Sequence, residues 1–396
     1  MRITPASELE ARIAKLQAEM VQQDLDAVLL LQNADLFYFT GSIQQGVLFV
    51  PCSGDSIYMV RKDAQRARME SGLKNVVPFR SFSALPEVLA DFGVTLPGRA
   101  GMELDVLPVA IYQRFQKLLG SCVITDATPL VRTVRAVKSK YEIGIMKDAG
   151  VQVNKVYERA LEVIREGMTD LELAAELEFV ARKEGHQGIT RMRAFNNELF
   201  YGHIFSGTDS AVPTYLDTPL GGMGVNPSVG QGASYKTIRP NEVICVDFAG
   251  AFDGYLIDQT RIFCLGGLPE QLVKAYDDML AVQHRMLELA VPGASWGGIY
   301  TACCEFAAEL GYQDSFMGPK GSQVSFIGHG VGIEIDEYPF IARGFDDYEL
   351  KEGMTFAFEP KVVFPGLGAI GIENTFQLKE LIAKRLTPSP EELVVL

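Results

Sequence analysis

The chain has 396 residues and a formal net charge of −14, with 47% hydrophobic and 22% charged residues. This composition is close to the average of soluble globular proteins and excludes a disordered or collagen-like chain. The length predicts two or three domains. The acidic excess repels phosphate backbones and anionic lipids, so we expect neither nucleic acid nor a membrane as a partner.

The cysteines and the N-terminal segment indicate the compartment. No CxxC occurs among the six cysteines, at 52, 122, 245, 264, 303 and 304, so we interpret them as reduced packing residues. The first 20 residues lack the apolar core of a signal peptide. No apolar run reaches the roughly 18 residues that a membrane span needs. We therefore expect a cytoplasmic protein.

The first third of the chain alternates between helix and strand patterns. Residues 7–24 carry apolar side chains at helical spacing, and 61–72 and 104–119 also favour helices. Short apolar runs at 27–31, 46–50 and 56–60 predict buried strands. This alternation predicts an α/β domain. A proline and a basic run at 128–140 indicate its end, so we assign residues 1–130 to this domain and 131–396 to a second.

The second domain mixes long helices with strands. Helices are predicted over 139–165, 169–184, 269–290 and 295–310, and strands over 242–264 and 324–380. Thr169 followed by Glu172 has the spacing of a helix capping box. The Gly-rich run at 221–232 lacks a phosphate-loop pattern and is interpreted as a long loop over the site, with a role in shaping the pocket or a subunit contact as the alternative.

Two carboxylates are placed on one face by a predicted hairpin at 242–263. Asp253-Gly254 is a strong two-residue turn signal. With that turn, Asp247 lies opposite Thr260, and Asp258 shares the face of Asp247. The neighbouring positions are apolar, so the face looks buried, and unpaired buried carboxylates are costly. A bound cation would remove that cost.

A second hairpin is predicted near the C-terminus, at 355–378. A turn centred on Gly366 places Glu359 directly across from Glu373, although Pro360 can disturb this register. Opposed like charges weaken a sheet, and a shared cation would reverse that effect.

His329 lies between the two hairpins in sequence, among Gly328, Gly330 and Gly332, which would let backbone and ligand approach closely. Two Asp, one His and two Glu suit Mn²⁺, Fe²⁺, Co²⁺ or Zn²⁺, often as a pair. Taken singly, each residue is more often a turn, edge or solvated side chain. The mirrored pairs together favour a metal site.

The order Asp247, Asp258, His329, Glu359, Glu373 resembles the metal-ligand set of the pita-bread metallopeptidases, in their creatinase, prolidase and aminopeptidase P branch. The segments VDFAGAFDGYLIDQTRIF, GHGVGIEIDEYP, KEGMTFAFEP and GAIGIENTFQL carry the resemblance, which covers nearly the whole chain. It implies an α/β N-terminal domain followed by an α+β pita-bread catalytic domain. It also implies a homodimer.

The resemblance implies a dinuclear site that holds two divalent metal ions, with Mn²⁺ first and Fe²⁺, Co²⁺ or Zn²⁺ as alternatives. Asp258 and Glu373 would hold a bridging hydroxide, Asp247 would complete one metal position, and His329 and Glu359 would complete the other. Glu359 would also carry a proton to the leaving nitrogen. The implied enzyme is a metallopeptidase-like hydrolase of the Xaa-Pro aminopeptidase or dipeptidase type.

Several positions depart from the family's usual pattern. Thr214 and Asp336 stand where two histidines are usual, Lys361 replaces the glycine of EPG, and Gly371 and Asn374 alter RIED. The missing histidines would donate hydrogen bonds to substrate. His203 is a candidate replacement, and an ionised Asp336 accepts only and would favour a cationic substrate group.

These departures leave three hypotheses open, in this order. The first is an Xaa-Pro peptidase acting on a small peptide. The second is a non-peptidase on the same fold, either a small-molecule C–N hydrolase of the creatinase type or a lyase. The third is a non-catalytic binding module, which retention of all five ligand positions disfavours. His186 and His284 are interpreted as structural.

Overall fold

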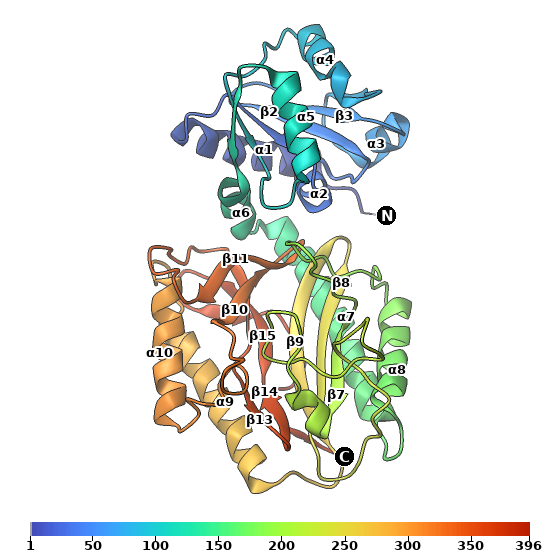
Figure 1. Cartoon of the computed structure of the whole chain (residues 1–396), viewed down its shortest axis with the longest axis vertical. Coiled ribbons are helices and arrows are strands. Elements are labelled where there is room, and N and C mark those ends of the chain that lie inside the picture. Colours follow the sequence, from blue (N-terminus) through green and yellow to red (C-terminus); the bar gives the residue numbers. More distant parts are fainter. Residues whose placement is uncertain (1) are drawn as a thin grey trace. The chain divides into compact units, whose positions relative to one another are not determined.

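The computed structural model describes residues 2–396 (Figure 1). The chain forms two compact units, each described here by itself. Unit 1 contains the residues up to Arg135 together with the short segment Arg193–Asn196, and unit 2 contains Ala136–Met192 and Asn197–Leu396. The boundary predicted from the sequence, between residues 130 and 131, falls inside helix α6 (Thr128–Ala136) and stays a prediction.

Unit 1 is a mixed six-stranded sheet in the order β4-β3-β2-β1-β5-β6. The strands are β1 (Ala27–Leu30), β2 (Gly46–Pro51), β3 (Ile57–Val60), β4 (Val76–Pro78), β5 (Arg99–Met102) and β6 (Val123–Asp126). The helices are α1 (Ala6–Gln22), α2 (Asn33–Thr40), α3 (Ala64–Glu70), α4 (Leu85–Asp91) and α5 (Val109–Leu119). The predicted α/β pattern is confirmed, although α5 begins five residues later than the helix pattern suggested.

A buried ion cluster lies beside the apolar core of unit 1. Asp35, on α2, accepts hydrogen bonds from Arg135 Nη1 at 2.7 Å and from Arg193 Nη1 at 2.8 Å. Arg193 also donates to Asp105 at 2.6 and 2.9 Å. Burial raises the pKa of Asp35, but the two arginines outweigh this and hold it below its usual value. Unit 1 therefore depends on a residue far downstream in the sequence.

Unit 2 is built on a nine-stranded sheet whose main path is β11-β10-β12-β15-β9-β8-β7. β16 (Ala383–Arg385) pairs with β15, and β17 (Val394–Val395) pairs with β9. The path strands are β7 (Gly202–Ser206), β8 (Ile244–Phe252), β9 (Tyr255–Cys264), β10 (Phe326–Val331), β11 (Ile335–Ala342), β12 (Thr355–Phe358) and β15 (Glu373–Leu378). A separate ribbon is formed by β13 (Lys361–Phe364) and β14 (Gly368–Gly371).

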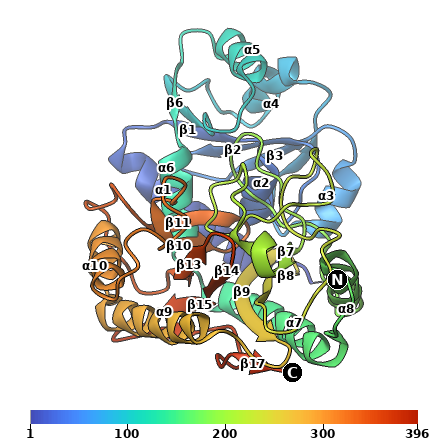
Figure 2. The same ribbon diagram turned by 60° about the horizontal axis from the view of Figure 1, so that its bottom comes forward.

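Four long helices flank this sheet: α7 (Lys140–Val163), α8 (Asp170–Lys183), α9 (Glu270–Leu289) and α10 (Trp296–Glu309). Helix α7 packs against β8 and β9, whereas α9 packs against β13 and β14 and α10 against β11 (Figures 1 and 2). The predicted capping box of α8 is present, with Thr169 Oγ1 accepting from the Glu172 N–H at 3.1 Å. Within residues 2–396, no helix combines the length and the apolar character needed to cross a bilayer.

Candidate metal centre

The β8–β9 hairpin places the first two predicted ligands side by side. Phe252 pairs with Tyr255 and Asp247 with Thr260, as the Asp253-Gly254 turn predicted. Asp258 lies opposite Ala249, two residues along the same face. Both carboxylates are buried, with Asp247 9% and Asp258 8% exposed. Their burial requires compensation by positive charge or hydrogen bonds.

The second hairpin keeps the predicted register, but its two arms form two separate strand pairs, β12 with β15 and β13 with β14. Phe358 pairs with Asn374 on one side of the site, and Lys361 pairs with Gly371 on the other. Glu359 and Glu373 thus face each other between these pairs. The strand pairing is weakened at Pro360, which has no N–H to donate and whose carbonyl accepts from the Ile372 N–H at 3.3 Å, and the ribbon β13–β14 forms a separate two-stranded sheet.

His329 lies on β10, where it pairs with Ala357 of β12. The adjacent Gly330 allows close packing of strands rather than of a ligand, since a Cβ there would lie 2.3 Å from the Glu337 carbonyl oxygen. His329 Nδ1 lies 3.3 Å from the Gly330 carbonyl oxygen. Burial lowers the pKa of the ring, but the surrounding carboxylates outweigh burial and raise this pKa to about 10, so that a metal bound at Nε2 must displace a proton. A proton kept on Nδ1 by the Gly330 carbonyl would then leave Nε2 as the metal-binding nitrogen.

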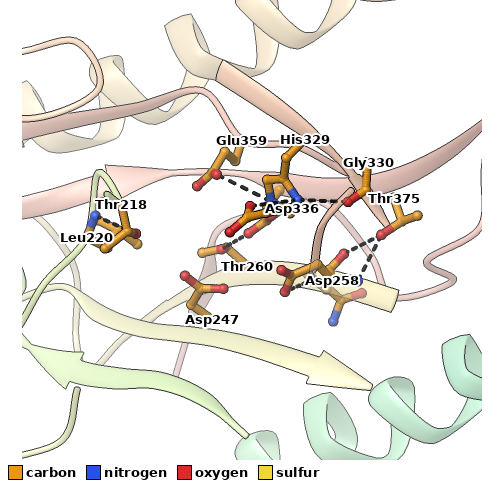
Figure 3. Close-up of polar contacts among 12 residues, drawn as sticks. Thr218, Leu220, Asp247, Asp258, Thr260, His329, Gly330, Asp336, Glu359 and Thr375 are labelled. Atoms are coloured by element: carbon orange, nitrogen blue, oxygen red, sulfur yellow. Dashed lines mark hydrogen bonds and ion pairs between the residues drawn. The ribbon is translucent and has the colours of Figure 1, made fainter. Parts of the chain in front are cut away.

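The five predicted ligands all line one pocket. Figure 3 shows Asp247 and Asp258 on one side of the site and His329 and Glu359 on the other. His329 Nε2 lies 3.6 Å from Glu359 Oε1 and 3.7 Å from Glu373 Oε1. Asp258, His329 and Glu373 each offer a ligand atom within 4.8 Å of the others. Buried carboxylate oxygens with one imidazole nitrogen fit a divalent first-row ion.

The ammonium group of Lys361 also lies inside this cluster. Its Nζ donates to Glu359 Oε2 at 2.6 Å, to Glu373 Oε2 at 3.1 Å and to Asp247 Oδ2 at 3.4 Å. The side chain is 1% exposed. Lys361 is one of the departures from the family pattern, and the sequence alone predicts no contact between it and the ligands. Lys361 begins strand β13, directly after Pro360, and its long side chain extends from there to the carboxylates.

The buried carboxylates, His329 and Lys361 shift one another's pKa values. Burial raises the pKa of Asp258 well above its usual value and that of Glu359 to about 7. Burial also raises the pKa of Glu373, but the Lys361 ammonium and His329 outweigh it and set the pKa to about 2. Burial lowers the pKa of Lys361, yet three carboxylates raise it well above its usual range. Lys361 is therefore a cation in this structure.

The two other predicted catalytic residues both line the pocket. His203 lies on β7 opposite Asp247, and its Nε2 is 2.9 Å from Gln231 Oε1. Asp336 Oδ1 is 3.6 Å from His329 Nδ1. Thr214, in contrast, donates to the Gly230 carbonyl at 2.8 Å. Thr214 does not line the pocket, whereas the nearby residues Leu216, Asp217 and Thr218 do.

The Gly-rich loop at 221–232 helps to shape the pocket, which is the alternative interpretation of this run. Gln231 binds His203 and also donates to the Glu198 carbonyl at 2.7 Å. The loop folds back on itself, with Gly232 N–H donating to the Gly221 carbonyl at 2.8 Å. It therefore holds the pocket wall that carries His203.

Three further residues orient the ligands and were not predicted. Thr260 Oγ1 donates to Glu373 Oε2 at 2.8 Å, and Thr375 Oγ1 accepts from the Asp258 N–H at 2.9 Å. Arg261 is buried and donates to the Glu373 carbonyl at 2.8 Å and to Asn374 Oδ1 at 2.7 Å. The predicted register already placed Thr260 opposite Asp247, so its polar side chain on a buried face was the available signal.

Comparison with known proteins identifies the family. Residues 144–380 match Metallopeptidase family M24, and residues 12–137 match the Creatinase/Prolidase N-terminal domain. The chain belongs to metallopeptidase family M24. The M24 match contains all five predicted ligand positions and most of unit 2. The resemblance inferred from the sequence is thereby confirmed.

Relatives of this M24 protein extend over the whole chain. An Xaa-Pro dipeptidase from Pyrococcus furiosus is 29% identical over 388 residues, covering 98% of this chain and 100% of the relative. The solved prolidase from Pyrococcus horikoshii OT3 has 25% identity and a TM-score of 0.80, covering 97% of this chain and 100% of the other. An Xaa-Pro dipeptidase structure from Bacillus anthracis, at 24% identity, has a TM-score of 0.83 with 98% and 100% coverage. The predicted fold class, an α/β N-terminal domain before a pita-bread domain, is confirmed.

Proposed function

We propose that this M24 protein is a metal-dependent Xaa-Pro peptidase, acting as a dipeptidase or aminopeptidase on small peptides. The observation that carries the proposal is the convergence of Asp247, Asp258, His329, Glu359 and Glu373 in one pocket. Full-length relatives named Xaa-Pro dipeptidase support the same substrate class.

The metal proposed for the site is a divalent first-row ion, with Mn²⁺ favoured because four of the five donors are carboxylates. When bound, such an ion supplies Lewis-acid activation of water and of the scissile carbonyl. Buried Asp258, His329 and Glu373 would hold it. Thr260, which donates to Glu373, keeps that carboxylate oriented. The number of ions depends on Lys361.

The remaining pocket residues are proposed to bind the peptide and move the proton. Glu359 would take a proton on Oε1, which faces His329, and deliver it to the leaving nitrogen. His203, whose Nε2 donates to Gln231 Oε1, would offer its Nδ1 as an acceptor for a substrate N–H. Leu199, Leu216 and Ile335 provide apolar surface that suits a proline ring.

A second candidate function is hydrolysis of a small cationic metabolite at a C–N bond. It is favoured by Asp217 and Asp336, two acidic pocket residues outside the predicted ligand set. Thr214, bonded to Gly230, also leaves one substrate-binding histidine of the family without a counterpart at that position.

The deciding experiment is a turnover assay on the Mn²⁺-loaded protein with Xaa-Pro dipeptides and longer Xaa-Pro peptides, read by mass spectrometry. We expect cleavage before proline in the parent and a loss of at least about 10²-fold in Glu359→Gln. Glu242→Gln is the control, because Glu242 pairs with Lys236 and lies outside the pocket lining. Cleavage of cationic amides but not of Xaa-Pro bonds would support the second candidate.

We also propose a cytoplasmic homodimer. All six cysteines are free thiols, which supports a reducing compartment. Light scattering coupled to size-exclusion chromatography tests the dimer: a mass near 43.5 kDa, that of one chain, would contradict it.

A further inference from the structure

We propose that Lys361 occupies one of the two cation positions of the centre, so that the protein binds a single divalent ion beside its own ammonium group. The inference rests on the proposed metal site and changes the number of ions that the sequence predicted. Lys361 Nζ contacts carboxylate oxygens of Glu359, Glu373 and Asp247 at 2.6, 3.1 and 3.4 Å. An ammonium has three N–H donors, and here three predicted ligands receive them.

The carboxylates divide their oxygens between two positions. Glu359 and Glu373 each direct Oε2 to Lys361, while Oε1 of each lies 3.6–3.7 Å from His329 Nε2. These two groups thus bridge the ammonium and the space in front of His329. That space is where Asp258, His329 and Glu373 bring ligand atoms within 4.8 Å of one another. One position holds the ammonium, and the other suits one ion.

The local fold makes room for the lysine. Lys361 pairs with Gly371 across β13 and β14, and a Cβ at Gly371 would lie only 2.8 Å from Lys361 Cγ. Thr260 supports the same arrangement, because its hydroxyl donates to the Glu373 oxygen that Lys361 also contacts. The buried position of Lys361 is therefore set by the pairing of β13 with β14.

The charges are consistent with this assignment. Asp247, Asp258, Glu359 and Glu373 contribute four negative charges when ionised, in a buried site where unpaired charge is costly. One ammonium and one divalent ion supply three positive charges, which leaves a net charge of −1 on the site. A second divalent ion near Asp247 would have to displace the ammonium from that carboxylate, or lie against it in a medium that screens repulsion weakly.

The test is the number of ions per chain, measured without any peptide. The purified protein is stripped with chelator, reloaded with Mn²⁺, desalted and analysed by plasma mass spectrometry, with low-temperature EPR on the same samples. We expect one Mn²⁺ per chain and the spectrum of an isolated ion in the parent. Lys361→Gly vacates the position and should bind two ions per chain, a twofold rise, with the spectrum of an exchange-coupled pair.

Lys138→Ala is the matched control. Lys138 is equally buried, at 1% side-chain exposure, but its ammonium pairs with Glu337 at 2.7 Å, outside the predicted ligand set. It should keep one ion per chain. Two ions and a coupled pair in the parent would overturn the proposal, whether or not any variant folds. A folded Lys361→Gly protein that still takes one ion would overturn it as well. The peptidase proposal can fail without affecting either readout.

Discussion

At the scale of single residues, Asp336 is a pocket acid outside the predicted ligand set, and we expect it to select a substrate by charge. It lies 3.6 Å from His329, and its φ of 65° is a backbone conformation that asparagine also tolerates. Asp336→Asn should therefore fold normally and lose only the negative charge. We expect KM to rise about tenfold for substrates with a cationic group facing Asp336, and kcat to change little. Steady-state kinetics on charged and neutral substrate pairs would measure this. An equal rise for both would contradict charge recognition.

His186 has a structural role with a consequence for acid stability. Its Nδ1 accepts from the Gly188 N–H and its Nε2 lies 3.0 Å from the Ala249 carbonyl, so the buried ring is neutral. Burial lowers the pKa of His186 to about 4, whereas the unfolded value is 6.5. Between these values the unfolded chain binds a proton that the folded chain does not, so stability falls as pH falls from 6.5 towards 4.

From this pKa difference we expect the free energy of unfolding to be lower at pH 5 than at pH 7.5. The part of that decrease that is due to His186 should be about 2 kcal/mol. Urea unfolding of the parent and of His186→Gln at both pH values would measure it. The drop between the two pH values should be smaller in the variant by that amount. Equal drops would show that His186 titrates normally in the folded protein.

At the scale of elements, the β13–β14 ribbon depends on the lack of a side chain at Gly371. A Cβ there would lie 2.3 Å from the Pro360 carbonyl oxygen and 2.8 Å from Lys361 Cγ. Gly371→Ala should lower the free energy of unfolding by about 1–3 kcal/mol, as overpacking does. Gly144→Ala is the control, because Gly144 lies in α7 with open space around it. That change should be neutral or stabilising in urea titrations.

The registers of both carboxylate hairpins could be predicted because local turn chemistry sets them. Asp253-Gly254 places Asp247 opposite Thr260, and the same reasoning about Gly366 matches the pairs Phe358 with Asn374 and Lys361 with Gly371. Periodicity also located the long helices to within a few residues. These features depend on neighbours in sequence, which a single chain displays directly.

Contacts made by long side chains across the sheet could not be predicted in the same way. Nothing near Lys361 in sequence shows that its ammonium reaches Asp247, 114 positions away. Likewise, the support of His203 by Gln231 depends on how the Gly-rich loop folds back. The glycines around His329 were expected to admit a ligand, but Gly330 instead admits the backbone of β11. Such contacts are set by tertiary packing.

At the scale of the whole molecule, a bound ion would join distant parts of unit 2. Its proposed ligands come from β9, β10 and β15, so the ion stabilises only the folded sheet. Metal at about 100 times its dissociation constant should add about 2.7 kcal/mol to the free energy of unfolding. Calorimetry with and without EDTA would show this as a lower Tm after chelation. Glu373→Gln should make the Tm insensitive to EDTA; a parent Tm that ignores EDTA would contradict the metal site.

Unit 1 is made of two segments that are separate in the sequence, and this limits where its gene can be divided. Asp35 is held by Arg135 and by Arg193, and the second arginine is encoded 58 codons after the first. A gene cut after codon 135 would yield a product whose buried Asp35 keeps one of its two arginines. The product would also lack the hydrogen bonds that Arg193 donates to Asp35 and Asp105, and hydrogen bonds to charged groups contribute about 1.5–3 kcal/mol each. Recombination that exchanges this domain with its ion cluster intact must therefore carry two separate stretches of coding sequence.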